Sequence, residues 1–116
     1  MLHVKHSKVA ILGGGSWGTT TASVISRYCD AILWARDGQI VDEINQAHTN
    51  HRYLGDAALN AKLAATTDIG AAVNQAEAVL IAVPSSHFRE VLASALSHLP
   101  MGIPLISLSK GLEKGS

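Results

Sequence analysis

Cysteine is almost absent from this chain of 116 residues, in which Cys29 is the only one. A single thiol cannot form an intramolecular disulfide, so the composition fits the reducing conditions of the cytoplasm, where we expect the protein to reside. We interpret Cys29 as a small structural residue at the end of a helix rather than as a nucleophile.

An excess of charge and long apolar runs are missing as well. Nine basic and nine acidic side chains balance, so we expect no nucleic acid partner. No apolar run reaches the roughly 18 residues of a membrane helix, and no signal peptide is visible, so we expect no membrane insertion. Two histidine pairs, His3 with His6 and His48 with His51, lack further ligands at a recognisable spacing, so we expect no metal.

What the chain does have is a cluster of glycines between a strand and a helix. An apolar segment at residues 8–12 stops at Gly13, and a helix-compatible segment follows at 16–28. Gly13, Gly15 and Gly18 have the G-x-G-x-x-G spacing of a dinucleotide-binding turn. In this motif the glycines allow the turn, the approach of a pyrophosphate and close packing of the helix, whose first N–H groups hold the anion. The three glycines are therefore predicted to bind a cofactor.

Strands and helices alternate along the rest of the chain. The expected strands are residues 8–12, 31–35, 62–66, 78–83 and 105–108. Helices are expected at 16–28 and after the N-caps Asp37, Asp68 and Ser85. Residues 45–60 are expected to form a loop. The alternation predicts a single α/β domain over residues 1–116, with a doubly wound parallel sheet of the Rossmann type.

Two of the expected helices have apolar positions at helical spacing. The apolar stripe of the helix after Ser85 is Phe88, Val91, Leu92, Ala95, Leu96 and Leu99, and its spacing predicts that this face packs against the sheet. The apolar positions of the helix-compatible segment at 16–28 are Trp17, Thr21, Val24, Ile25 and Tyr28.

The second expected strand is followed directly by Arg36 and Asp37. At this point NAD-binding domains tend to carry an acidic residue for the ribose hydroxyls, whereas a nearby arginine suits the 2′-phosphate of NADP. Arg36 therefore favours NADP, and Asp37 leaves NAD open. Lys110 follows the last expected strand, at the sheet edge where ligands bind, and is a candidate point charge for a phosphate or a carbonyl.

Five motifs, in order and with their spacing, resemble the amino-terminal domain of NAD(P)-dependent glycerol-3-phosphate dehydrogenases. They are Gly13-Gly14-Gly15-Ser16-Trp17-Gly18-Thr19, Leu33-Trp34-Ala35-Arg36, Tyr53-Leu54, Val83-Pro84-Ser85 and Ser109-Lys110-Gly111-Leu112-Glu113. The Ser16-Trp17 pair is the most specific to the family. Two positions depart from the family pattern. Gly14 stands where the family often has Ala, a change we expect to have no steric cost, and Gly55 stands where it usually has Pro.

The resemblance implies that the intact protein interconverts dihydroxyacetone phosphate and glycerol 3-phosphate with NADP or NAD, in support of glycerophospholipid synthesis. It implies that Ser16, Trp17 and Arg36 contact the dinucleotide and that Lys110 is shared between the cofactor and the phosphate ester substrate. In the family a helical carboxy-terminal domain supplies the general base, so we expect this chain to be a truncated domain without a catalytic residue and with little turnover alone. The intact protein from which this domain derives can form a homo-oligomer under this interpretation.

Two other interpretations remain open on the sequence alone. The chain could be a stand-alone sensor that binds NAD(P) and performs no chemistry. It could also belong to another small dehydrogenase, of the ketopantoate reductase or 6-phosphogluconate dehydrogenase type. The Ser16-Trp17 pair and the Ser109-Lys110-Gly111 segment argue against the second alternative, through resemblance alone.

Overall fold

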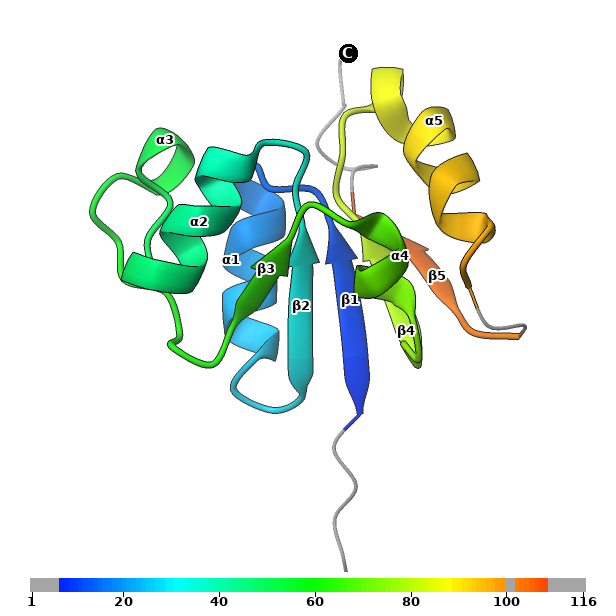
Figure 1. The fold of residues 1–116 in the computed structure, drawn as a ribbon, viewed down its shortest axis with the longest axis horizontal. Coiled ribbons are helices and arrows are strands. Elements are labelled where there is room, and N and C mark those ends of the chain that lie inside the picture. The colour runs from blue at the N-terminus through cyan, green and yellow to red at the C-terminus, as the bar shows by residue number, and fades with distance from the viewer. Residues whose placement is uncertain (1–6, 100–101, 109–116) are drawn as a thin grey trace, which may run out of the picture.

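The computed structural model describes residues 7–99 and 102–108, which form a parallel sheet of five strands in the order β3-β2-β1-β4-β5 (Figure 1). The strands are β1 (Lys8–Leu12), β2 (Asp30–Trp34), β3 (Ala64–Thr66), β4 (Ala78–Ile81) and β5 (Leu105–Ser107). The helices are α1 (Ser16–Ile25), α2 (Gly38–Ala47), α3 (His51–Leu54), α4 (Ile69–Val73) and α5 (Ser85–Leu96). The predicted Rossmann-like α/β fold is confirmed.

The central strand β1 supplies side chains to both faces of the sheet, because successive residues of a strand point in opposite directions. Val9 and Ile11 pack on the face covered by α1 and α2. Ala10 and Leu12 pack on the opposite face, under α4 and α5. Figure 1 shows α1 behind the sheet and α4 in front of it. Helices therefore cover both faces, and the sheet is doubly wound.

The strand order reverses between β1 and β4. From β1 the chain moves outward through β2 to β3 and then returns through α4 to pair β4 with β1, where Ile11 lies opposite Leu80. In such sheets a crevice opens at the carboxyl ends of the strands beside this reversal, and ligands bind there. The turns after β1 and β4 meet at this point.

Several predicted boundaries need correction. The helix predicted to reach residue 28 ends at Ile25, because backbone bonds from Arg27 and Tyr28 reach back only three residues and tighten the last turn. The segment predicted as a loop contains the end of α2 and a helical turn, α3. Pro84, and not Ser85, occupies the capping position of α5. The predicted caps Asp37 and Asp68 are confirmed, since each side chain accepts a backbone N–H at its helix start.

The apolar positions of the segment at 16–28 do not all face the sheet. Small residues of α1 are buried against it, at Gly18, Thr19 and Ala22. Trp17 and Tyr28 are instead 48% and 76% exposed. A helix that approaches the sheet this closely has no room for large residues beneath it. Leu96 of α5, predicted to face the sheet, is exposed because it lies at the edge of the stripe whose centre is Val91 and Ala95.

Candidate functional site

The turn after β1 is built so that its first residue has to be glycine. Gly13 has a φ of +129°, and a Cβ placed on it would lie 2.4 Å from the carbonyl oxygen of Ala82. Its N–H donates to the carbonyl oxygen of Trp34 at 2.8 Å, which continues the β1–β2 ladder into the turn. The chain therefore leaves β1 in a direction that residues with a side chain rarely adopt.

The other two glycines of the motif differ in what surrounds them. A Cβ on Gly18 would lie 2.1 Å from the carbonyl oxygen of Gly13, so the start of α1 rests directly on the turn. A Cβ on Gly15 would meet no atom of the described residues within 4 Å, its chain neighbours aside. The missing side chain of Gly15 thus leaves open space rather than relieving an internal contact, as a turn that admits a bulky anion requires.

Gly15 is the N-cap of α1 and offers no side-chain hydrogen bond to the helix. The first intrahelical bond of α1 runs from the N–H of Thr19 to the carbonyl oxygen of Gly15. The N–H groups of Ser16, Trp17 and Gly18 therefore precede the helical ladder, at the positive end of the helix dipole and beside the open space at Gly15. The local geometry suits a phosphate group.

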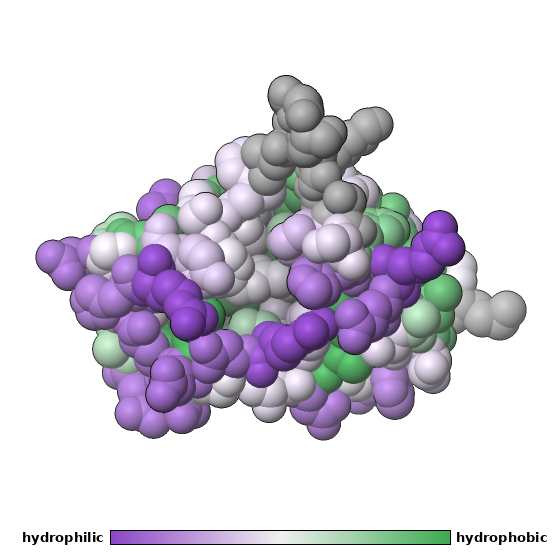
Figure 2. All heavy atoms as spheres, turned by 90° about the horizontal axis from the view of Figure 1, so that it is seen from above, coloured by the Kyte–Doolittle hydropathy of each residue, from purple (hydrophilic) through white to green (hydrophobic). Residues whose placement is uncertain are grey.

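A cavity of about 470 Å³ lies against this turn, at the carboxyl ends of β1, β2 and β4. Figure 2 looks down on this edge of the sheet and shows pale and apolar residues in the middle, with strongly hydrophilic residues along one side. The cavity is lined by Gly13, Gly14, Gly15, Trp34, Ala35, Arg36, Asp37, Ile40, Arg52, Tyr53, Ala82, Val83, Pro84, His87 and Val91. Its volume falls in the range of small-molecule sites. The cavity that touches the strand starts, of about 370 Å³, contains none of the predicted site residues.

The charged residues predicted after β2 lie on the wall of this cavity. The Arg36 side chain is 59% exposed, and its Nη2 lies 3.8 Å from Oε1 of Glu90 on α5. Asp37 has more partners. Its Oδ1 accepts the N–H of Gln39 at 2.8 Å, as the cap of α2, and its Oδ2 lies 3.0 Å from Nη1 of Arg52. Arg36 therefore has one long ion pair, whereas both carboxylate oxygens of Asp37 accept a hydrogen bond.

The remaining predicted site residues stand apart from the cavity wall or beyond the described residues. Ser16 and Trp17 form the first turn of α1, are exposed, and are absent from the cavity lining. Lys110 and the rest of the Ser109-Lys110-Gly111-Leu112-Glu113 motif lie outside the described residues.

One functional residue that the sequence did not reveal is Asn50, which is fully buried. Its Nδ2 donates to the carbonyl oxygen of Gly14 and to Oγ1 of Thr19, both at 3.0 Å. A segment from beyond α2 thereby clamps the glycine turn to the start of α1. The sequence signal was weak, because Asn50 stands in a polar stretch that is typical of an exposed loop.

Arg52 and Tyr53 also line the cavity without having been predicted to do so. Both belong to α3, and the Arg52 guanidinium carbon lies 5.9 Å from the centre of the Tyr53 ring. Tyr53 and Leu54 form one of the motifs that carry the family resemblance, which by itself assigns them no contact with a ligand. The adjacent cation and aromatic ring could have indicated a ligand contact, because such pairs suit phosphates and bases.

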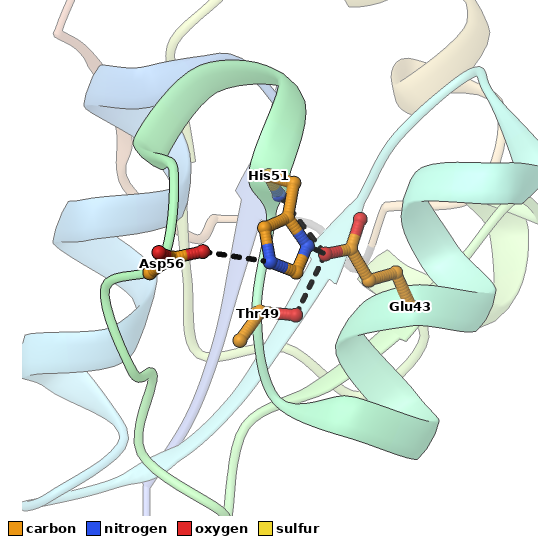
Figure 3. Close-up of polar contacts among 4 residues, drawn as sticks. All are labelled: Glu43, Thr49, His51 and Asp56. Atoms are coloured by element: carbon orange, nitrogen blue, oxygen red, sulfur yellow. Dashed lines mark hydrogen bonds and ion pairs between the residues drawn. The ribbon is translucent and has the colours of Figure 1, made fainter.

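Glu43 of α2 holds α3 in place (Figure 3). Its Oε2 accepts from Oγ1 of Thr49 at 2.6 Å and from the backbone N–H of His51 at 3.0 Å, and it also contacts Nδ1 of His51. The other ring nitrogen of His51 lies 3.2 Å from Oδ1 of Asp56. The hydrogen bond from Thr49, followed by that from the backbone of His51, lowers the pKa of Glu43 below its ordinary value.

The part of the chain that the structure describes contains neither a metal-binding group of side chains nor a membrane-spanning helix. No group of three or more histidine, cysteine, aspartate or glutamate residues within residues 7–99 and 102–108 is arranged to hold a metal ion. None of the helices in these same ranges is both long enough and apolar enough to cross a membrane.

The glycine turn, the free helix start and the cavity at the strand reversal together define a dinucleotide-binding domain of the Rossmann class. Residues 8–116 match the model of the NAD-dependent glycerol-3-phosphate dehydrogenase N-terminus. The chain belongs to this family, as the amino-terminal NAD-binding domain. The alternative assignment to a ketopantoate reductase or 6-phosphogluconate dehydrogenase type is therefore set aside.

Named relatives agree with this assignment. The chain is 49% identical over 109 residues to glycerol-3-phosphate dehydrogenase (NAD(P)+) 2 of Sphingopyxis alaskensis, covering 94% of this chain and 33% of that enzyme. It is 46% identical over 114 residues to glycerol-3-phosphate dehydrogenase (NAD(P)+) of Mycobacterium avium. The match covers 97% of this chain and 33% of that enzyme. The crystal structure of glycerol-3-phosphate dehydrogenase from Coxiella burnetii matches with a TM-score of 0.81 and 32% identity, over 88% of this chain and 32% of that one. The chain thus spans about a third of the length of these relatives.

Proposed function

We propose that this domain binds NADPH or NADH in the cavity at the glycine turn, as part of a dehydrogenase that interconverts dihydroxyacetone phosphate and glycerol 3-phosphate. The observation that carries the proposal is the open space at Gly15, which adjoins both the N-terminus of α1 and the cavity. A pyrophosphate there meets backbone N–H groups and the positive helix end. The family to which the chain belongs supplies the reaction.

In this proposal each predicted residue has a role at the cofactor. Gly13 and Gly18 shape the turn, and Gly15 admits the pyrophosphate. Ser16 and Trp17 provide N–H groups at the helix start, and Arg36 faces the adenosine end from the cavity wall. Lys110 contacts the nicotinamide end and the phosphate ester substrate, as the family resemblance implies.

The chemistry is proposed for the intact protein and not for these 116 residues alone. The nicotinamide would supply the hydride for reduction of the ketone, or accept it from the alcohol, and a general base of the intact protein would exchange the proton. This domain holds and orients the cofactor, which is the entropic part of catalysis. We further propose a cytoplasmic enzyme that supports glycerophospholipid synthesis, with room for a homo-oligomer, and little turnover by the isolated domain.

Fluorescence titration tests the binding proposal. Trp34 lines the cavity, its side chain is 9% exposed, and its Nε1 donates to the carbonyl oxygen of Thr67 at 2.9 Å, so it is a fixed reporter at the site. We expect saturable quenching by NADPH and by NADH, with NADPH bound at least as tightly. Oxidation of NADPH that depends on dihydroxyacetone phosphate, measured with the intact protein, tests the reaction. Absence of saturable binding by both cofactors would overturn the proposal.

A further inference from the structure

Asp37 occupies the position from which a carboxylate reads the ribose of NAD, yet its carboxylate already has two partners. Oδ1 accepts from the backbone of Gln39 within the same helix start. Oδ2 is paired with Arg52, a cation that comes from α3 and is separated from Asp37 by 15 positions in the sequence. The first contact is part of the α2 cap, and the second is an ion pair between side chains that can separate.

The ion pair is open to exchange. The side chains of Arg52 and Asp37 are 58% and 35% exposed, so water screens their attraction and little is lost when they part. Within the described residues, Nη1 is the only nitrogen of the Arg52 guanidinium with a hydrogen-bond or ion-pair partner. The remaining donors of this planar group are available to a ligand that enters the same cavity.

Arg36 provides a second cation on the same cavity. Its single ion pair in the described part of the chain is the 3.8 Å contact with Glu90, which His87 also faces at 3.8 Å. Arg36 and Arg52 thus approach the cavity from two different elements, the end of β2 and α3. Two guanidinium groups suit a phosphate that carries two negative charges, since each can donate to two of its oxygens.

We propose that Arg52 and Asp37 together select between the two forms of the cofactor, an inference that rests on the proposed binding of NAD(P). When the adenosine carries a 2′-phosphate, Arg52 leaves Asp37 and joins Arg36 on the phosphate. When the ribose has a free 2′-hydroxyl, Arg52 keeps its ion pair and Asp37 accepts the hydrogen bond from the hydroxyl. The same two side chains thereby admit either cofactor.

The position of α3 makes this exchange local. Glu43 accepts from Thr49 and from the backbone of His51, the residue before Arg52, so the start of α3 is anchored to α2 independently of the ion pair. The Tyr53 ring, 5.9 Å from the guanidinium carbon, lies beside Arg52. The side chain of Arg52 can therefore change its partner while the backbone that carries it stays in place.

Two substitutions in the intact protein separate this role from a structural one. Arg52→Gln removes the second cation, and we expect the Kd for NADPH to rise about tenfold while that for NADH stays within about twofold. Asp37→Asn keeps a good N-cap for α2 but removes the negative charge. We expect it to bind NADPH at least as tightly as the wild type and NADH several-fold more weakly. The two variants should shift the ratio of the Kd values in opposite directions.

A structural ion pair predicts a different pattern, because both substitutions break the same contact and should then weaken both cofactors alike. That result would overturn the inference. Arg52→Lys gives an independent reading if the glutamine variant does not fold, and we expect it to retain part of the NADPH affinity as a point charge. Adenosine 2′,5′-bisphosphate and adenosine 5′-monophosphate serve as probes of the adenosine end alone. A wild-type protein that binds neither NADPH nor NADH refutes the proposed function and this inference with it, whereas normal binding with equal losses refutes the inference alone.

Discussion

The buried amide of Asn50 donates to the carbonyl oxygen of Gly14 over 3.0 Å, across 36 positions of sequence. The same Nδ2 also donates to Oγ1 of Thr19 at 3.0 Å. The glycine turn is therefore held from two sides: by the strand that precedes it and by a segment that follows α2. This contact makes the shape of the turn depend on residues far from the motif itself.

Replacement of Asn50 by Ala should affect both stability and cofactor binding. The substitution leaves the half-buried Gly14 carbonyl and the buried Thr19 hydroxyl without this donor, which costs about 1–3 kcal/mol. Because the turn is then less fixed before binding, we expect the Kd for NADPH to rise several-fold as well. Urea unfolding and fluorescence titration measure the two effects.

Asn45→Ala is the matched control for that experiment. The Asn45 side chain also makes two hydrogen bonds, one each way with the backbone of Ala65, but they tie α2 to β3 away from the glycine turn. We expect a similar loss of stability with unchanged cofactor affinity. Equal effects of both variants on affinity would show that Asn50 has no specific role at the turn.

Gly14→Ala should destabilise the domain, contrary to the expectation from the sequence that this exchange has no steric cost. A Cβ at position 14 would lie 2.7 Å from the Cβ of Ala35. Neither methyl group can rotate away, so we expect a loss of about 1–3 kcal/mol. The double variant Gly14→Ala with Ala35→Gly removes the clash and should recover most of it. Unfolding measurements on all four proteins complete the cycle, and simple additivity would contradict the contact.

The decrease in the free energy of unfolding at acidic pH should depend on Glu43. Its hydrogen bonds with Thr49 and the backbone of His51 lower its pKa in the folded state, so the folded protein binds this proton less tightly than the unfolded chain does. The stabilisation is present above the pKa of the unfolded state and is lost as the pH falls through that of the folded state. Glu43→Gln should therefore be less stable than the wild type at neutral pH, with the difference vanishing in acid.

Urea unfolding of both proteins between neutral pH and pH values below the carboxylate range measures this convergence. Glu77→Gln is the control, because the Glu77 side chain is exposed and has no hydrogen bond to the described residues. A constant difference between wild type and Glu43→Gln at every pH would mean that the ionised carboxylate of Glu43 is not what holds α3.

Arg36→Ala should weaken NADPH selectively. The guanidinium lies on the cavity wall and is tied only to Glu90, at 3.8 Å, within the described chain. Loss of one charged contact to a 2′-phosphate predicts a rise of about tenfold in the Kd for NADPH and little change for NADH. Titrations of Arg36→Ala with NADPH and with NADH measure the two Kd values. An equal loss of affinity for both cofactors would contradict a role of Arg36 at the 2′-phosphate.

The sequence predicts the fold and the glycine turn well because both depend on local patterns. Gly13 and Gly18 are needed where the backbone itself approaches closely, and a spacing rule captures that requirement. The strand β1 and the caps Asp37 and Asp68 likewise follow from short-range chemistry. The strand and the caps need no knowledge of distant contacts, whereas Gly13 is constrained also by the carbonyl oxygen of Ala82, 2.4 Å from where its Cβ would lie.

What the sequence does not predict depends on tertiary packing. Asn50 and Arg52 reach the site from a polar segment whose helical turn is stabilised by Glu43, a residue of another helix. The outer face of α1 carries Trp17 and Val24 because the inner face must accommodate a close approach to the sheet. Hydrophobic spacing alone could not distinguish the two faces, since the residues that fit beneath the helix are the small ones.

The most direct test of the account is to fill the space at Gly15. This residue has φ −78° and ψ −170°, a backbone conformation open to valine, and a Cβ there meets no atom within 4 Å in the described part of the chain beyond its two neighbours in sequence. Valine is a poorer N-cap than glycine, so we expect Gly15→Val to melt somewhat below the wild type but to stay folded, and to lose saturable binding of both NADPH and NADH. Gly38→Val, at the exposed start of α2, is the control and should bind normally. Unchanged binding of NADPH by Gly15→Val would contradict the central claim that the glycine turn holds the cofactor's pyrophosphate.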